Sequence, residues 1–168
     1  MPLLETQHLS LRQFVEDDAP FILELLNDPA FIKNIGDRGV RNLDDARSYI
    51  TNGPVAMHER YGFGLLAVEL KDSGLPIGMC GLIKRDSLED VDLGYAFLER
   101  HRGKGYASEA AAAVIDFGRK TVGLKRIVAI TAQDNKGSIN VLQKMGFHFE
   151  KLIILPDETE EINLFALE

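Results

Sequence analysis

A basic loop with two glycines joins an apolar segment to an alanine-rich segment in this chain, and this order predicts a strand followed by an anion-binding loop and a helix. The apolar run Val91–Leu98 predicts a strand, and Ser108–Ala113 belongs to a predicted helix. The loop between them, Arg102–Gly105, carries two cations and two glycines. A helix N-terminus attracts anions through its free N–H groups, and glycines leave those donors uncovered by side chains. The loop therefore predicts a pyrophosphate site.

The spacing of the glycines argues against two other phosphate-binding loops. A P-loop places four residues between its glycines and then Lys-Ser/Thr, whose hydroxyl binds magnesium. Here one residue separates Gly103 from Gly105, and Tyr106 follows. A dinucleotide fingerprint needs a third glycine where this chain has Ser108, within an early βαβ unit that the sequence lacks. A nucleotide-binding phosphotransferase is therefore disfavoured.

Hydrophobic periodicity and turn residues predict alternating strands and helices, without a linker or an internal repeat. The expected helices run from Glu16 to Pro29, from Asn42 toward His58, from Tyr106 to about Lys120, and from about Ser138 to Met145. The expected strands are Leu9–Phe14, Phe63–Leu70, Ile77–Ile83, Val91–Leu98, Ile127–Thr131, Phe147–Leu155 and Glu161–Leu167. This order favours an α/β fold with a partly parallel central sheet.

Three segments of the chain resemble one protein family. The segment Arg100–Gly105 has the form Arg-x-x-Gly-x-Gly, which resembles the coenzyme A signature of the GCN5-related N-acetyltransferases. The segment Asp134–Phe147 resembles a later helix of that family, whose asparagine faces the pantetheine arm of the coenzyme. The opening Leu4–Phe14 and the triplet Asn27–Pro29 resemble the RimJ/RimL-like branch, which acetylates protein N-termini. The resemblance covers essentially the whole chain.

The resemblance implies one N-acetyltransferase domain over residues 1–168, with acetyl-CoA as co-substrate and no metal. Its fold would be α/β, with a mixed central sheet of about seven strands flanked by about four helices. The pantetheine arm would pair with the main chain of the strand before the loop, and the pyrophosphate would lie on the loop itself. The implied cofactor-binding residues are Tyr95, Ala96, Phe97, Arg102, Gly103, Lys104, Gly105, Tyr106, Ala107, Asn135 and Ser138.

The implied reaction is acetyl transfer from acetyl-CoA to a primary amine by direct attack. Deprotonation at pH 7 costs about 4.6 kcal/mol for a lysine and about 1 kcal/mol for a protein N-terminus, so an N-terminal amine needs little help from a strong base. Positioning and polarisation of the carbonyl then supply much of the catalysis. The acceptor is expected to be a protein N-terminus or a small-molecule amine.

Two residues are candidates for proton transfer. Many family members have a tyrosine seven residues after the position of Asn135 to protonate the departing thiolate, but this chain has Leu142 there. Ser138 is a candidate donor in its place, or it satisfies a backbone donor in a helix capped by Asn135. Asp92 lies near the position of a glutamate base in some members, or it is a solvated strand residue. Because Leu142 lacks a hydroxyl, a catalytically weak acyl-CoA-binding or partner-binding module is the alternative function.

The composition of the chain indicates which kinds of partner and which cell compartment are expected. With 26 acidic and 19 basic residues the formal net charge is −7, which argues against a nucleic-acid partner and favours cationic amines. No apolar run has membrane-spanning length and no signal peptide is evident, so a cytoplasmic protein without membrane association is expected. The single cysteine, Cys80, excludes an internal disulfide and is expected to be buried. A monomer and a homodimer both remain compatible with the sequence.

Overall fold

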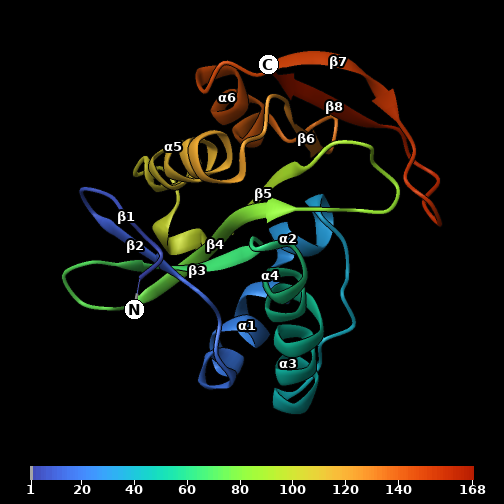
Figure 1. The fold of residues 1–168 in the computed structure, drawn as a ribbon. Coiled ribbons are helices and arrows are strands. Elements are labelled where there is room, and N and C mark those ends of the chain that lie inside the picture. Colours follow the sequence, from blue (N-terminus) through green and yellow to red (C-terminus); the bar gives the residue numbers. More distant parts are fainter. Residues whose placement is uncertain (1) are drawn as a thin grey trace.

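Eight strands form one mixed sheet in the computed structural model, which describes residues 2–168 (Figure 1). Their spatial order is β1-β2-β3-β4-β5-β6-β8-β7. The eighth strand, β1, was not expected, because two residues are too short to show an alternating pattern. The strands are β1 (Leu4–Glu5), β2 (Leu9–Arg12), β3 (Leu65–Leu70), β4 (Pro76–Ile83), β5 (Asp92–Phe97), β6 (Ile127–Thr131), β7 (His148–Ile153) and β8 (Ile162–Leu167).

All neighbouring strands are antiparallel except β5 and β6, which are parallel. The strand β5 pairs with β4 along its whole length. With β6 it makes a single ladder pair, Asp92↔Val128, and beyond that pair the two strands diverge. The connection between them contains the helix α5 (Tyr106–Phe117), as a parallel crossover requires. The sheet therefore has an opening between β5 and β6.

Helices cover both faces of the sheet (Figure 1). The helices α1 (Ala19–Leu26), α2 (Pro29–Asn34), α3 (Leu43–Ile50) and α4 (Ala56–Tyr61) lie on one face, and α5 and α6 (Lys136–Lys144) lie on the other. A π-helical turn, Thr51–Val55, joins α3 to α4 and contains Pro54. Within residues 2–168, no helix has both the length and the apolar character needed to span a bilayer.

Residues 2–168 contain six α-helices, more than the expected number of about four, because the expected second helix is divided into α3 and α4 and because α2 was not expected. The first helix ends before Pro29, as predicted, and Pro29 also begins α2, at a position where a missing N–H costs nothing. The cap of α3 is confirmed, since Asn42 accepts the Asp45 N–H at 2.8 Å. Gly146, after α6, has a φ of +96°, which confirms the predicted left-handed end.

Small side chains let α5 lie close to the sheet. Ala110 and Ala111 have no exposed surface, as the predicted apolar face requires. At Gly118, which follows α5, a Cβ atom would lie 3.2 Å from the side chains of Leu82 and Ile127. This close packing fixes the N-terminus of α5 relative to the opening between β5 and β6.

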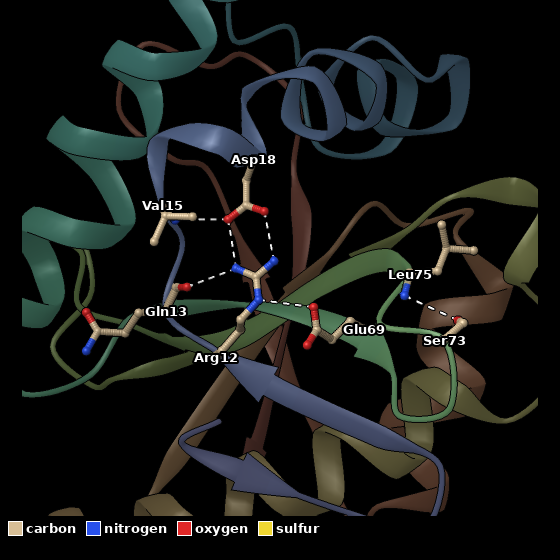
Figure 2. Close-up of polar contacts among 7 residues, drawn as sticks. All are labelled: Arg12, Gln13, Val15, Asp18, Glu69, Ser73 and Leu75. Carbon is tan, nitrogen blue, oxygen red and sulfur yellow. Dashed lines mark hydrogen bonds and ion pairs between the residues drawn. The ribbon is translucent and has the colours of Figure 1, made fainter. Parts of the chain in front are cut away.

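A polar cluster joins the first strands to the helical layer (Figure 2). Arg12, at the end of β2, donates to both carboxylate oxygens of Asp18 at 2.8 Å and to Glu69 of β3 at 3.1 Å. Asp18 also accepts the Val15 N–H at 2.9 Å. Burial raises the pKa of Asp18, but the hydrogen bonds from Arg12 and Val15 outweigh burial and leave that pKa below its ordinary value. The cluster therefore anchors the start of α1 to the sheet.

Candidate active site

The divergence of β5 from β6 leaves one edge of β5 without a strand partner. The opposite edge is paired with β4, including Tyr95↔Cys80 and Ala96↔Met79. On the side facing β6, no strand of residues 2–168 forms a ladder with β5 beyond Asp92. Alternate main-chain N–H and C=O groups of residues 95–97 therefore face the opening. An extended chain that carries amide groups, such as a pantetheine arm, fits this edge.

The glycine loop follows β5 and leads into α5. Gly103 and Gly105 have φ values of +75° and +83°, a conformation that strains residues with a side chain. A Cβ atom at either position would meet no atom within 4 Å, so the space above the loop is open. The helix begins at Tyr106 without a side-chain cap, which leaves its first N–H groups without a side-chain acceptor. These features fit a diphosphate.

The two loop cations lie differently from one another. The sequence predicts that Arg102 binds the phosphates of the cofactor with its charge. In the structure its guanidinium instead donates to the Phe97 carbonyl at 2.9 Å and to Asp28 at 2.6 Å. Arg102 therefore ties the loop to β5 and to the segment between α1 and α2. Lys104 is exposed and pairs with no acidic side chain of residues 2–168, so its charge remains available to an anion.

The first turn of α6 faces β5 across the opening. Asn135 caps this helix by accepting the Ser138 N–H at 3.3 Å, which confirms its predicted capping. The Ser138 hydroxyl lies 2.7 Å from the hydroxyl of Tyr95, whose single hydrogen also has the Ser138 carbonyl oxygen within reach at 3.2 Å. Two of the predicted cofactor residues, Tyr95 and Ser138, are thus joined by their side chains.

The hydroxyl of Tyr95 is a polar group that sequence reasoning missed. The resemblance assigned only the main chain of Tyr95 to the cofactor. Strand alternation was the available signal, because it puts Tyr95 on the same face as Leu93 and Phe97, which pack in the core beneath α5. Burial raises the pKa of Tyr95 to about 12, against a smaller lowering by the hydrogen bond with Ser138. The phenol therefore stays protonated at neutral pH.

Asp92 is not the solvated strand residue that one interpretation of the sequence gave. It is 1% exposed, and its Oδ2 accepts a hydrogen bond from Arg85 Nε at 2.6 Å. Its Oδ1 is buried without a hydrogen-bond partner in residues 2–168. Burial raises the pKa of Asp92, and the nearby charge of Arg85 opposes that rise. Asp92 lies in the ladder pair where the opening begins, so a carboxylate with one free oxygen marks its vertex.

A cavity of about 460 Å³ lies on the side of the opening that carries Asp92's ion pair. Three segments line it: Arg38 from the α2–α3 connection, Arg85 to Ser87 from the β4–β5 connection, and Leu155 to Glu158 from the β7–β8 connection. Arg85 belongs both to the cavity wall and to the ion pair with Asp92. Arg85 therefore connects the cavity wall to Asp92, which is 1% exposed and does not itself line the cavity. It is large enough for a small substrate or a peptide end.

The single cysteine, Cys80, has no exposed surface and packs in the core, which confirms its predicted burial. Among residues 2–168, no three His, Cys, Asp or Glu side chains gather as a ligand set for a metal ion.

Comparisons with known proteins agree with this geometry. The family model described as an acetyltransferase (GNAT) domain matches residues 8–148. The ribosomal-protein-serine acetyltransferase of Escherichia coli is 27% identical over 161 residues, which cover 93% of this chain and 84% of that protein. The crystal structure of an acetyltransferase from Agrobacterium tumefaciens has a TM-score of 0.85 at 26% identity, covering 100% of this chain and 95% of that one.

A further solved structure shares the fold. RimL, described as a ribosomal L7/L12 α-N-protein acetyltransferase in complex with coenzyme A, has a TM-score of 0.84 at 18% identity, covering 99% of this chain and 97% of that one. The α/β fold implied by the sequence is therefore confirmed, with eight strands in place of about seven. The family match spans most of the chain, including the open edge of β5 and the glycine loop. This chain accordingly belongs to the GNAT family of N-acetyltransferases, and its relatives include RimL-like enzymes.

Proposed function

We propose that this chain transfers the acetyl group of acetyl-CoA to a primary amine by direct attack. The observation that carries the proposal is the continuous path from the open edge of β5 to the uncapped N-terminus of α5. When bound, acetyl-CoA supplies an acyl carbon activated as a thioester. RimL, a structural neighbour, is described in complex with coenzyme A.

The residues along this path hold the co-substrate in the proposal. The main chain of Tyr95, Ala96 and Phe97 bonds to the pantetheine amides along the open edge. Main-chain donors from Gly103 to Ala107 hold the diphosphate, with the charge of Lys104 beside them. Arg102 keeps the loop in place through Asp28 and the Phe97 carbonyl. Asn135 sets the first turn of α6 against the same path.

Asp92 is the proposed acceptor of the amine proton. A general base works best when its pKa approaches the working pH, and burial moves the pKa of Asp92 in that direction. Its Oδ1 has no partner in residues 2–168, so a proton can bind there without breaking the bond to Arg85. A main-chain N–H on the open edge of β5 polarises the thioester carbonyl as the amine attacks.

Ser138 is the proposed proton donor to the departing thiolate. The proposal places the single phenol hydrogen of Tyr95 in the 2.7 Å bond to Ser138 Oγ, the shorter of its two contacts, and not on the Ser138 carbonyl oxygen at 3.2 Å. The hydrogen of Ser138 is then free to point toward the sulfur. Leu142, at the family's tyrosine position, is buried and has no proton to offer.

The acceptor enters through the cavity at Arg38 and Arg85, as a protein N-terminus or a small-molecule amine. The test is thiol release from acetyl-CoA with a panel of amines that includes N-terminal peptides, lysine side chains and polyamines. We expect at least one amine to raise thiol release far above the hydrolysis rate and to form its N-acetyl product by mass spectrometry.

The alternative is a module that binds acyl-CoA with little catalysis. The observation that favours it is Leu142, which supplies no hydroxyl at the position where the family has a tyrosine. Tight binding of coenzyme A in calorimetry, together with background hydrolysis for every amine, would support this module and refute the transferase. Tight binding of ATP without coenzyme binding would refute both.

A further inference from the structure

We propose that the acceptor amine carries a carboxylate a few bonds away, which the guanidinium groups of Arg38 and Arg85 bind. The inference rests on the proposed function and names the substrate class of the same cavity. Both arginines line that cavity. A free amino acid and a peptide with an acidic residue near its N-terminus share this chemistry.

Arg38 stands apart from the other nine arginines of the chain. Eight of those nine donate hydrogen bonds to carboxylate or carbonyl oxygens, and Arg60 lies over the ring of Tyr61 at 5.0 Å. For Arg38, residues 2–168 provide neither an ion pair nor an aromatic partner. With 26 acidic residues against 19 basic ones, acidic partners are plentiful elsewhere on this surface. An unpaired arginine on a cavity wall is therefore available to an anionic ligand.

Arg85 adds a second donor group at the inner side of the cavity. Only its Nε is used, in the 2.6 Å hydrogen bond to Asp92. Its two terminal nitrogens donate to no atom of residues 2–168, and the side chain is 27% exposed. With its Nε bound to Asp92, the guanidinium of Arg85 keeps both terminal nitrogens available. These two nitrogens can donate two parallel hydrogen bonds to one carboxylate.

The charges of Arg38 and Arg85 both act on Tyr49, so the two guanidinium groups lie near the same phenol. Burial raises the pKa of Tyr49, and the positive charges of Arg38 and Arg85 both oppose the rise. Its hydroxyl therefore lies within electrostatic reach of both guanidinium groups. Tyr49 itself does not line the cavity, so the donor set for a carboxylate consists of the two guanidinium groups in its wall.

Because Arg85 also pairs with Asp92, a substrate carboxylate bound to Arg85 would orient the substrate's amine relative to Asp92. A carboxylate bound at Arg85 lies beside the residue that connects the cavity to Asp92, the proposed acceptor of the amine proton. An amine within a few bonds of that carboxylate is then directed toward the vertex of the opening. Asp86 and Glu158 lie on the exposed rim of the cavity, where solvent and salt weaken their repulsion of the substrate.

The test compares matched acceptors that differ in one carboxylate. One arm uses alanine against alaninamide, with kcat/KM expressed per neutral amine. The other uses the amidated tripeptides Ala-Asp-Ala and Ala-Asn-Ala, and so separates a free amino acid from an acidic peptide. We expect at least a tenfold preference for the carboxylate in one arm. Arg38→Gln is expected to remove that preference through KM, with kcat changed less than about twofold. The control Arg60→Gln is expected to leave it intact.

Equal kcat/KM values within both arms, or an equal loss for both members in Arg38→Gln, would overturn the inference. Binding is measured in parallel by calorimetry on the protein saturated with coenzyme A, using the same four compounds. If no amine is acetylated, the proposed function fails while binding still decides the carboxylate site. Preferential binding of the carboxylate member that depends on Arg38 then supports the site, and equal or absent binding refutes it.

Discussion

The hydroxyl of Tyr95 lies 2.7 Å from Ser138 Oγ and joins β5 to the first turn of α6 across the opening in the sheet. Tyr95 comes from the strand whose main chain we assign to the pantetheine arm, and Ser138 comes from the helix opposite. In the proposed complex with acetyl-CoA, this pair lies beside the departing thiolate. The proposal also gives Tyr95 the role of orienting the serine hydrogen.

Replacing either member of this pair is expected to slow the chemical step. Ser138→Ala removes the proposed proton donor and Tyr95→Phe removes the group that orients it, so each lowers kcat by about 10- to 100-fold. The KM for acetyl-CoA should change much less. Since both act on one proton, the double variant should be no slower than the slower single variant. Additive losses in steady-state kinetics would show that the two hydroxyls act separately.

The rate should depend on the ionisation of Asp92. Burial raises the pKa of Asp92 above the ordinary aspartate range, so kcat/KM is expected to fall on the acidic side as this carboxylate becomes protonated. Asp92→Asn should remove that acidic limb and lower kcat/KM at pH 7 by about 100-fold. A pH profile with an unchanged limb in Asp92→Asn would assign the base to another residue.

A side chain at Gly105 is expected to weaken coenzyme A binding. Gly105→Val puts a branched side chain beside the donors at the start of α5 and strains a residue whose φ is +83°. Gly62, whose φ is +80°, also has open space around it and lies at the end of α4, far along the chain from the loop. Gly62→Val is therefore a control that carries the same strain. Calorimetry should give at least a tenfold weaker Kd for Gly105→Val and an unchanged Kd for the control.

The cluster around Arg12 should make stability depend on pH in the acidic range. The pKa of Asp18 is lower in the folded protein than its ordinary value, so Asp18 contributes stability above its unfolded pKa, and that contribution is lost as pH falls through the folded pKa. Arg12→Ala should cost about 3 kcal/mol at pH 7, because it leaves a buried carboxylate unpaired, and less in acid. Arg47→Ala breaks an exposed pair with Asp44 and should have little effect. Urea unfolding at several pH values measures both.

The elements that depend on interactions between residues close together in the chain were predicted correctly from the sequence. The strand Ile127–Thr131, the cap Asn42 and the cap Asn135 are confirmed because hydrophobic alternation and capping side chains act within a few residues. The left-handed conformation of Gly103 and Gly105 was not predicted, although glycine is the residue that adopts it most readily. At Pro29 the predicted end of the first helix is confirmed, but the same proline also begins α2, a helix that was not predicted from the sequence.

Contacts between distant segments could not be predicted in this way. Arg102 pairs with Asp28 across 74 residues, and the sequence gives no sign that this charge is used inside the protein. Asp92 is buried and pairs with Arg85 from the preceding connection, and no local pattern in the sequence indicates this ion pair. The unpaired state of Arg38 is likewise visible only after the partners of the other arginines are known. Side-chain pairing across the fold thus decides which charged residues remain for function.

The single ladder pair between β5 and β6 also has a mechanical consequence. The strands β1 to β5 and the strands β6 to β8 form two parts of the sheet, and this pair is the only ladder pair between them within residues 2–168. The Val128 N–H bond to Val91, the Tyr95–Ser138 hydrogen bond, the crossover through α5 and a shared core also join them. A ligand that forms hydrogen bonds along the opening between β5 and β6 takes the place of a strand there and strengthens the connection between the two parts of the sheet. The melting temperature should therefore climb with ligand concentration, and amide hydrogen exchange should slow along this opening.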